Sequence, residues 1–279
     1  QLVERQADII EARTGIRLQV ANVAVRNVSR EREVALPDGV LTRDAHAVVA
    51  DPTIDLIVEV IGGIEPAREL ISTALAHGKP VVTANKELLA NVGHELWAQS
   101  DAVGVDLLFE AAVAGGIPLI RALRESLRGE PITRVMGIVN GTTNFILTKM
   151  AEEGTDYSAA LSEAQLLGFA ERDPTADVEG FDAGAKAAII ASIAFGARIV
   201  AGDVYHEVFS GITAADIAFA KRLGYVVKLL AIAEQENQSD PVAVRVHPAM
   251  VPVAHPLASV RDSYNAVFVE GDAVGSLMF

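Results

Sequence analysis

The chain has 279 residues, a hydrophobic fraction of 51% and a formal net charge of −14, and it contains no cysteine. This composition predicts one large or two medium folded domains rather than a disordered chain. The acidic balance argues against nucleic acid or an anionic membrane as a partner, because both require a basic face. The absence of cysteine excludes disulfides, thiolate catalysis and cysteine-ligated metals. With an amphipathic start and no apolar run long enough to span a bilayer, we expect a cytoplasmic protein.

The first 131 residues predict strands that alternate with helices, interrupted by a polar stretch over residues 26–33. Strands are expected at 18–25, 55–60, 80–83 and 105–109, and helices at 45–50, 66–78, 85–100 and 118–127. Such alternation is typical of parallel βαβ units, and nearly continuous apolar strands indicate a sheet covered on both faces. We therefore predict an α/β, Rossmann-like nucleotide-binding domain.

The regular alternation of strands and helices ends after residue 131, which we predict to be the domain boundary. A strand at 132–139 is followed mainly by helices and then by strands. Helices are expected at 145–152, 158–167, after Lys186 and at 214–223, and strands at 225–233, 242–246, 267–269 and 277–279. We predict an α+β catalytic and dimerisation domain over 132–261, with residues 262–279 returning to the first domain.

The glycine fingerprint G-x-G-x-x-G, which normally joins the first strand of such a sheet to its first helix, does not occur in this sequence. The first helical residues are also not preceded by a strand. We therefore expect the first strand and its glycine loop to lie upstream of Gln1.

The stretch over residues 164–186 gathers acidic residues beside an apolar helix and ends in Lys186. Asp182 precedes Lys186 by four positions, so the two side chains share a face of a helix. Acidic groups rarely gather beside a core helix without a partner, because an unpaired buried charge is costly. A lysine at the head of an apolar helix is partly desolvated, which suits it to proton transfer. The alternative is a solvated acidic loop that caps the helix, with Lys186 reaching to water.

Many positions in this stretch occur together at one characteristic spacing. They are Ala164, Gly168, Phe169, Ala170, Asp173, Pro174, Asp177, Val178, Gly180, Asp182 and Lys186. At this spacing they resemble the signature of the homoserine dehydrogenases, and so many positions in one window make a specific match. The resemblance extends from Asp55 to Lys228. It implies reversible reduction of aspartate 4-semialdehyde to homoserine, in threonine and methionine biosynthesis, by hydride transfer from NAD(P)H.

Four residues are candidates for contact with a dinucleotide cofactor. Arg26 follows a strand where NAD-specific sheets usually carry an acid, so it favours NADP over NAD unless it is an ordinary surface arginine. Gly62 and Gly63 would let the backbone approach the nicotinamide ribose, with a simple tight turn as the alternative. Gly168 is expected to let its loop approach the cofactor.

Lys86 lies in the first turn of the helix expected at 85–100, at the carboxyl end of a strand. Ligands of doubly wound sheets bind at this end. A positive charge opposes the helix dipole there, which favours a functional role, although a solvated lysine is about as common. The resemblance implies that Lys86 faces both cofactor and substrate.

A Gly-rich turn with one carboxylate, Glu110, follows the strand at 105–109. The residues themselves favour a simple turn before a helix that begins at Pro118. The resemblance implies a sodium ion here, with ligands from Glu110, Val113, Gly115 and Ile117. The turn over 139–144 is similar to the loop that faces the active site in this family, and its alternative is an ordinary Asn-Gly turn. The six histidines show no metal-ligand spacing.

The resemblance also implies roles for the charged residues. Lys186 is expected to be the general acid and base, with Lys86 as a second cation beside it. Glu171 is expected to bind the α-ammonium group of the substrate. Asp182 is expected to bind substrate and to orient Lys186, with Asp177 in support.

Two alternatives to this function remain. One is another two-domain NAD(P)-dependent oxidoreductase, although an acylating semialdehyde dehydrogenase would need a cysteine. The other is a non-catalytic dinucleotide-binding module. Strands of the second domain can also pair with those of a second copy across a two-fold axis, so we expect a homodimer.

Overall fold

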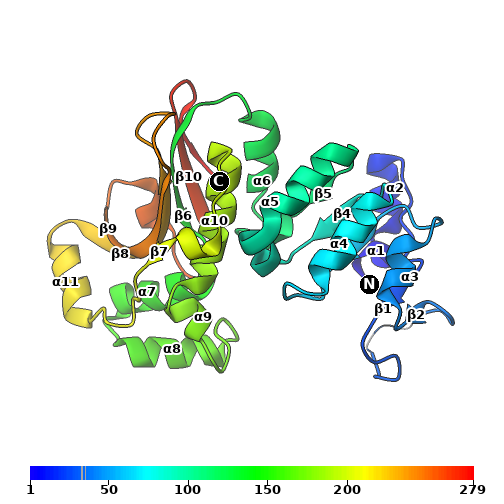
Figure 1. Cartoon of the computed structure of the whole chain (residues 1–279). Coiled ribbons are helices and arrows are strands. Elements are labelled where there is room, and N and C mark those ends of the chain that lie inside the picture. The colour runs from blue at the N-terminus through cyan, green and yellow to red at the C-terminus, as the bar shows by residue number, and fades with distance from the viewer. Residues whose placement is uncertain (33, 35) are drawn as a thin grey trace. The chain divides into compact units, whose positions relative to one another are not determined.

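The computed structural model describes residues 1–32, 34 and 36–279, so the last residue of the predicted polar stretch lies outside the described residues. The chain divides into two compact units (Figure 1). The first contains Gln1–Glu59, Glu65–Val82 and Leu96–Leu108, and the second contains Val60–Ile64, Thr83–Glu95 and Phe109–Phe279. Over the described residues, none of the helices combines the length and the apolar character that crossing a membrane requires.

The strands of the first unit form two sheets within the described residues. Strand β1 pairs parallel with β2, and β3, β4 and β5 follow one another in a three-stranded sheet in which β4 and β5 are parallel. Their bounds are Val23–Ala24, Leu41–Thr42, Ile57–Glu59, Val81–Thr83 and Leu107–Leu108. The strand expected at 18–25 is shorter and consists of β1 alone. Leu18 and Val20 lie before it and are exposed.

The helices of this part of the chain follow the predicted alternation. They are α1 (Leu2–Arg5), α2 (Ala7–Thr14), α3 (Ala45–Ala50), α4 (Ala67–Ala76) and α5 (Lys86–Val103). On α4, Ile71 and Leu75 are fully buried and lie one turn apart on the same face. Asp44 caps α3 by accepting a hydrogen bond from Ala47 N at 2.9 Å. The parallel α/β character of the first domain is confirmed.

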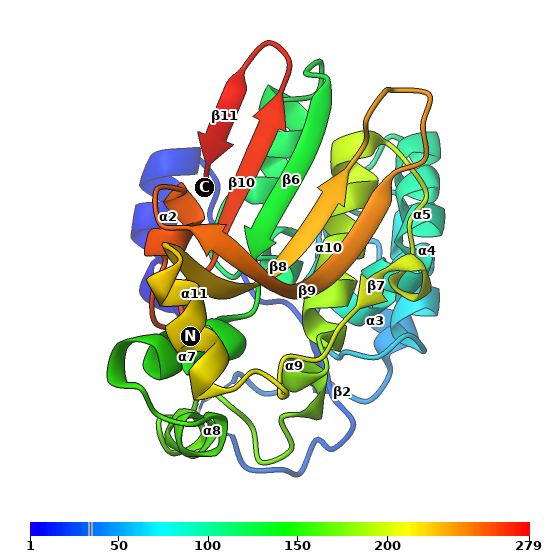
Figure 2. The same ribbon diagram turned by 90° about the vertical axis from the view of Figure 1, so that its left-hand side faces the viewer.

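The second unit is built on one six-stranded sheet in the order β11-β10-β6-β8-β9-β7 (Figure 2). The strands are β6 (Ile132–Ile138), β7 (Tyr205–His206), β8 (Tyr225–Glu234), β9 (Ala243–Pro252), β10 (Ala266–Gly271) and β11 (Gly275–Met278). The antiparallel ladder between β8 and β9 runs from the Tyr225–Pro252 pair to the Glu234–Ala243 pair. The α+β character predicted for the second domain is therefore confirmed.

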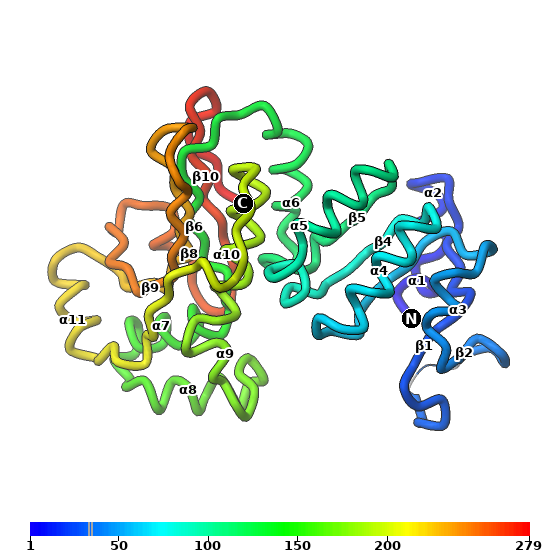
Figure 3. The backbone as a smooth tube through the Cα atoms, in the orientation of Figure 1, coloured from blue at the N-terminus to red at the C-terminus, as the bar shows by residue number. Residues whose placement is uncertain are grey.

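Helices and helical turns link these strands, and the chain can be followed from β6 through α7 and α8 to α10 along the tube in Figure 3. They are η1 (Glu110–Ala112), α6 (Leu119–Arg121), η2 (Ala122–Ser126), α7 (Gly141–Glu153), α8 (Tyr157–Leu166), α9 (Thr175–Val178), α10 (Phe181–Phe195), η3 (Ala201–Asp203), α11 (Ala214–Arg222) and η4 (Pro256–Ser259).

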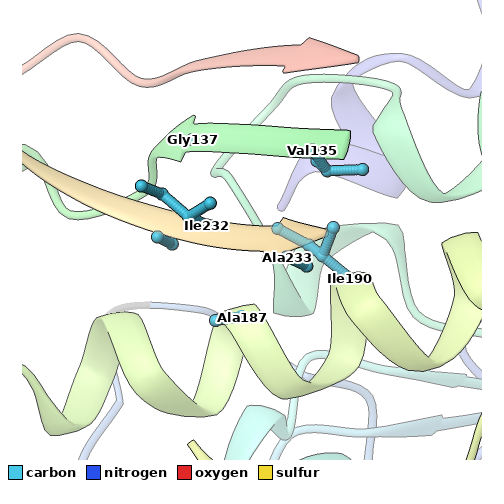
Figure 4. Close-up of a pocket in the computed structure, with 7 residues that line it drawn as sticks. Val135, Gly137, Ala187, Ile190, Ile232 and Ala233 are labelled. Carbon is cyan, nitrogen blue, oxygen red and sulfur yellow. The ribbon is translucent and has the colours of Figure 1, made fainter. Parts of the chain in front are cut away.

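Helix α10 packs against one face of the sheet and positions the residues at its own start. Ala187 and Ile190 of α10 face Val135, Ile232 and Ala233 of the sheet (Figure 4). The gap between them measures about 10 Å³, near the lower limit for a single water molecule. Close packing of this kind resists displacement. The first turn of α10, which carries Asp182 and leads to Lys186, therefore has a rigid support.

Two predictions about the domains require correction. Strands β10 and β11 do not return to the first unit, because β10 pairs antiparallel with β6 and buries Val267 and Val269 in the six-stranded sheet. The last continuous segment of the second unit also begins at Phe109, earlier than the predicted boundary at residue 131, and its η2 packs against α10.

Candidate functional site

A cavity of about 510 Å³ lies in the second unit, within the range of small-molecule sites. Five of the predicted site and signature residues contribute charged side chains to its lining, and one histidine lies with them. These residues are Lys86, Glu171, Asp173, Asp177, Asp182 and His206. The cavity therefore combines an excess of carboxylates with at least one ammonium group, which suits a small zwitterionic or cationic ligand.

Asp182 lies between two lysines. Its Oδ1 forms an ion pair with Lys86, and its Oδ2 accepts a hydrogen bond from Lys186 Nζ at 2.6 Å. Lys186 Nζ also donates to Val139 O at 2.7 Å. The Asp182 side chain is 6% exposed, that of Lys186 15%, and that of Lys86 45%. Both ammonium groups are thus held by one buried carboxylate. The Lys86 side chain is partly open to solvent, whereas the Lys186 side chain is mostly buried.

The environment keeps Asp182 ionised. Burial by itself raises the pKa of this carboxyl group, but the nearby charges and hydrogen bonds of Lys186 and Lys86 outweigh it and lower the pKa below its ordinary value. A carboxylate in the first turn of a helix also interacts favourably with the helix dipole. Asp182 is therefore a permanent anion at neutral pH.

Gly180 makes this arrangement possible. It precedes α10 with φ of +80°, a left-handed conformation that glycine adopts without strain. The turn directs the chain from α9 into α10, so that Asp182 comes one helical turn before Lys186 on the same face. The four-residue spacing noted in the sequence produces the contact that it predicted.

The loop that carries Glu171 is held from two sides. Gln165 Nε2 donates to the carbonyl oxygens of Glu171 at 3.1 Å and Arg172 at 3.4 Å. Thr142 Oγ1 donates to Phe169 O at 2.6 Å, and the Phe169 ring lies 4.9 Å from that of Phe145. Glu171 itself is exposed and lines the cavity. The loop therefore presents an exposed carboxylate on an anchored backbone.

Asn140, which no sequence pattern singled out, contacts two of these carboxylates. Its Nδ2 donates to Asp177 Oδ1 at 2.7 Å and to Asp182 Oδ2 at 2.8 Å, and it is 5% exposed. His206 was also not selected, although it lines the cavity with its ring 5.2 Å from that of Phe181. The resemblance of the turn at 139–144 to an active-site loop indicated this region. Nothing in the sequence, however, predicts which groups the Asn140 amide contacts.

Lys86 is linked to the glycine pair after β3. Asn85 caps α5 by accepting from Leu88 N at 3.1 Å, and its Nδ2 donates to Gly63 O at 2.7 Å. Gly62 and Gly63 have φ values of +75° and +73°, and the space around Gly62 is open. An open, positive-φ backbone at the carboxyl end of a strand fits close approach of a dinucleotide.

Gly168 and Arg26 are the remaining candidates for contact with the cofactor. Gly168 has φ of +79° at the end of α8, as a turn requires. Arg26 is exposed beyond β1 in the first unit, and its role stays a prediction.

The predicted sodium loop has Ala114 and Gly115 at positive φ. The carboxylate of Glu110 accepts from Ile120 N at 2.8 Å and Arg121 N at 2.9 Å, so it supports the start of α6. Among the described residues, no three His, Cys, Asp or Glu side chains gather in a group that could hold a metal. A cation here would depend on the oxygen donors of Glu110, Val113, Gly115 and Ile117, a set that suits a hard ion.

Comparison with known proteins identifies relatives of both parts of the chain. Residues 118–279 match the family model "Homoserine dehydrogenase", and residues 1–110 match "Homoserine dehydrogenase, NAD binding domain". Homoserine dehydrogenase of Corynebacterium glutamicum is 52% identical over all of this chain, which covers 63% of that protein. The Bacillus subtilis enzyme is 46% identical, again over all of this chain and 64% of its own length.

Solved structures give the same result. A homoserine dehydrogenase from Thiobacillus denitrificans superposes with a TM-score of 0.91 at 46% identity, over 99% of this chain and 64% of that one. A hyperthermophilic archaeal homoserine dehydrogenase in complex with NADPH has a TM-score of 0.72 at 28% identity, over 98% of this chain and 75% of that one. The chain thus spans a little under two thirds of the length of the curated relatives named above.

Proposed function

Because the chain belongs to the homoserine dehydrogenase family, we propose that the protein carrying it interconverts L-homoserine and L-aspartate 4-semialdehyde with a nicotinamide dinucleotide. The observation that supports this proposal best is the Lys86–Asp182–Lys186 cluster: Lys86 and Asp182 line the cavity together with Glu171 and Asp177, and Lys186 is paired with Asp182. Proton-transfer groups and carboxylates for an amino-acid substrate then share one site.

Lys186 supplies the proton chemistry in this proposal. Reduction of the aldehyde places negative charge on its oxygen, and the Lys186 ammonium group donates a proton there; the reverse reaction returns a proton to the amine. The nicotinamide, when bound, supplies or accepts the hydride. Asp182 and Val139 O hold the Lys186 nitrogen in place. Lys86 adds a second positive charge beside the developing oxyanion and faces the cofactor.

Glu171 binds the α-ammonium group of homoserine, since it is an exposed carboxylate on an anchored loop that lines the cavity. Asp182 accepts from Lys86, Lys186 and Asn140, and a carboxylate has about four acceptor sites, so one remains for substrate. Asp177 supports this group through its shared donor, Asn140. A neutral or purely anionic substrate would bring no positive charge to the Glu171 carboxylate.

The cofactor is proposed to be NADP, with NAD as the alternative. The match to an NAD-binding family model and the NADPH complex of the archaeal relative support a nicotinamide dinucleotide. Gly62 and Gly63 would receive it, with Lys86 near the reacting ring, and Gly168 would let its loop approach the cofactor. The preference for NADP rests on Arg26 and on the missing acid beside it.

Three further features complete the proposal. A sodium ion bound at residues 110–117 would brace the start of α6. A homodimer would cover exposed apolar side chains of the second unit, of which Met250 and Tyr264 are examples. The cytoplasm is the proposed location.

One assay tests the function. Protein is incubated with homoserine and either NADP⁺ or NAD⁺, and reduced nicotinamide is followed by absorbance, with the Lys186→Ala variant as control. Turnover with homoserine that the variant loses supports the proposal. Turnover only with other hydroxy compounds would favour a different oxidoreductase, and cofactor binding without turnover would favour a non-catalytic module.

A further inference from the structure

Asn140 performs two tasks with its single amide group. As the N-cap of α7, its Oδ1 accepts from Thr143 N at 2.9 Å. From the other end of the amide, Nδ2 donates one hydrogen to Asp177 Oδ1 at 2.7 Å and the other to Asp182 Oδ2 at 2.8 Å. Donor and acceptor sites are thus both used, in a place that is 5% exposed.

Capping alone does not explain an asparagine here. Asn, Asp, Ser and Thr are all good N-caps, and Asp performs about as well as Asn. Of these four, only Asn combines a cap acceptor with two donor hydrogens on one nitrogen. Two neighbouring carboxylates require both hydrogens, because each would otherwise face another anion. The residue type is therefore determined by the carboxylates.

The preceding residue completes the arrangement. Val139 O accepts from Lys186 Nζ at 2.7 Å, while the side chain of Asn140 donates to the carboxylate that pairs with the same lysine. The end of β6 thus contacts both partners of the Lys186–Asp182 ion pair. Gly141 lets this turn approach the chain at Ser263, since a Cβ there would lie 2.6 Å from Ser263 O.

We propose that Asn140 is a positioning residue that holds Asp177 and Asp182 side by side as anions, and through Asp182 fixes Lys186 for proton transfer. This role in catalysis rests on the proposed function, but the effect on the carboxylates does not. Removing the amide donors leaves Asp182 with fewer hydrogen bonds to its ionised form, so it should bind a proton more readily.

Two variants separate the two tasks. Asn140→Ser keeps a cap oxygen but cannot serve two acceptors with one hydrogen, and Asn140→Asp keeps the cap while replacing both donors with an anion. Asp156→Ser is the matched control, since Asp156 caps α8 by accepting from Ala159 N at 2.8 Å. The titration of Asp182 is followed by carboxyl ¹³C NMR and assigned by the loss of its signal in Asp182→Asn. Thermal unfolding reports on the cap.

The midpoint for Asp182 should rise by about one pH unit in Asn140→Ser and further in Asn140→Asp, whereas Asp156→Ser should leave it unchanged. In the activity assay, the acid limb of kcat/KM should move in the same order. Asn140→Ser, which keeps a cap oxygen, should unfold closer to the wild-type temperature than Asn140→Asp, which buries a third carboxylate beside two others. An unchanged midpoint in Asn140→Asp would overturn the proposal. If wild type fails to oxidise homoserine, the proposed function fails, and the NMR titration still decides the role of Asn140.

Discussion

The stability of the second unit should depend on pH through Lys228. This lysine lies on β8 with 2% of its surface exposed. Its Nζ donates to Asn144 Oδ1 at 2.9 Å and to Val260 O at 2.5 Å. Asn144 Nδ2 in turn donates to the carbonyls of Val260, Arg261 and Tyr264. A single buried ammonium group thus joins α7 to the segment after η4.

Burial lowers the pKa of Lys228 from 10.5 to about 8, although the nearby charge of Glu152 opposes the shift. The unfolded chain therefore binds more protons than the folded one between these two pH values, and the free energy of unfolding must rise as pH increases through this range. The shift corresponds to about 3 kcal/mol, since one pKa unit equals about 1.4 kcal/mol. Below about pH 8 the full cost of the buried charge is present.

Urea unfolding of wild type and Lys228→Met, from neutral pH to about 10.5, measures this effect. Other groups titrate in the same range, so the informative quantity is the difference between the two proteins at each pH. Wild type should gain about 3 kcal/mol relative to the variant over this interval. Lys221→Met on the exposed side of α11 is the matched control and should follow wild type. A constant difference between wild type and Lys228→Met would refute the reasoning.

Three other predictions concern the proposed site. Lys186→Ala should lower kcat by about 100-fold or more, the scale of general acid–base catalysis, while circular dichroism shows a retained fold; a kcat within a few-fold of wild type would remove Lys186 from this role. Glu171→Gln should raise KM for homoserine with a smaller change in kcat, because it weakens a ground-state contact, and an equal KM would count against the assignment. Arg26→Ala should raise KM for NADP⁺ but not for NAD⁺ if the guanidinium meets the 2′-phosphate, so equal changes with both cofactors would contradict the preference.

Much of the fold follows from local sequence patterns. The helices expected at 45–50 and 214–223 lie within one residue of those bounds, and Asp44 and Thr213 serve as their N-caps. The contact between Asp182 and Lys186 was also predictable, because a four-residue spacing on a helix leaves few alternatives. Signals of this kind act within one or two turns of the chain and need no knowledge of the rest.

The pairing of strands in a sheet cannot be predicted from local patterns in this way. Strands β10 and β11 have ordinary strand sequences, and nothing in them tells whether they join the first or the second sheet. Pairing with β6 is decided by the apolar face that the whole sheet buries, to which Ile138, Leu230 and Phe268 contribute. The predicted return of residues 262–279 to the first domain failed for this reason.

The sequence by itself determined the alternation of strands and helices, the acidic window beside an apolar helix and the lysine at its head, because these depend on residue type and short spacing. Only the tertiary structure decided that Asp182 lies between Lys86 and Lys186, and that the amide of Asn140 holds two carboxylates. Asn140 is separated from Asp177 by 37 positions and from Asp182 by 42, and Lys86 lies farther still from Asp182 along the chain. Such contacts arise from packing of distant elements, which no local pattern records.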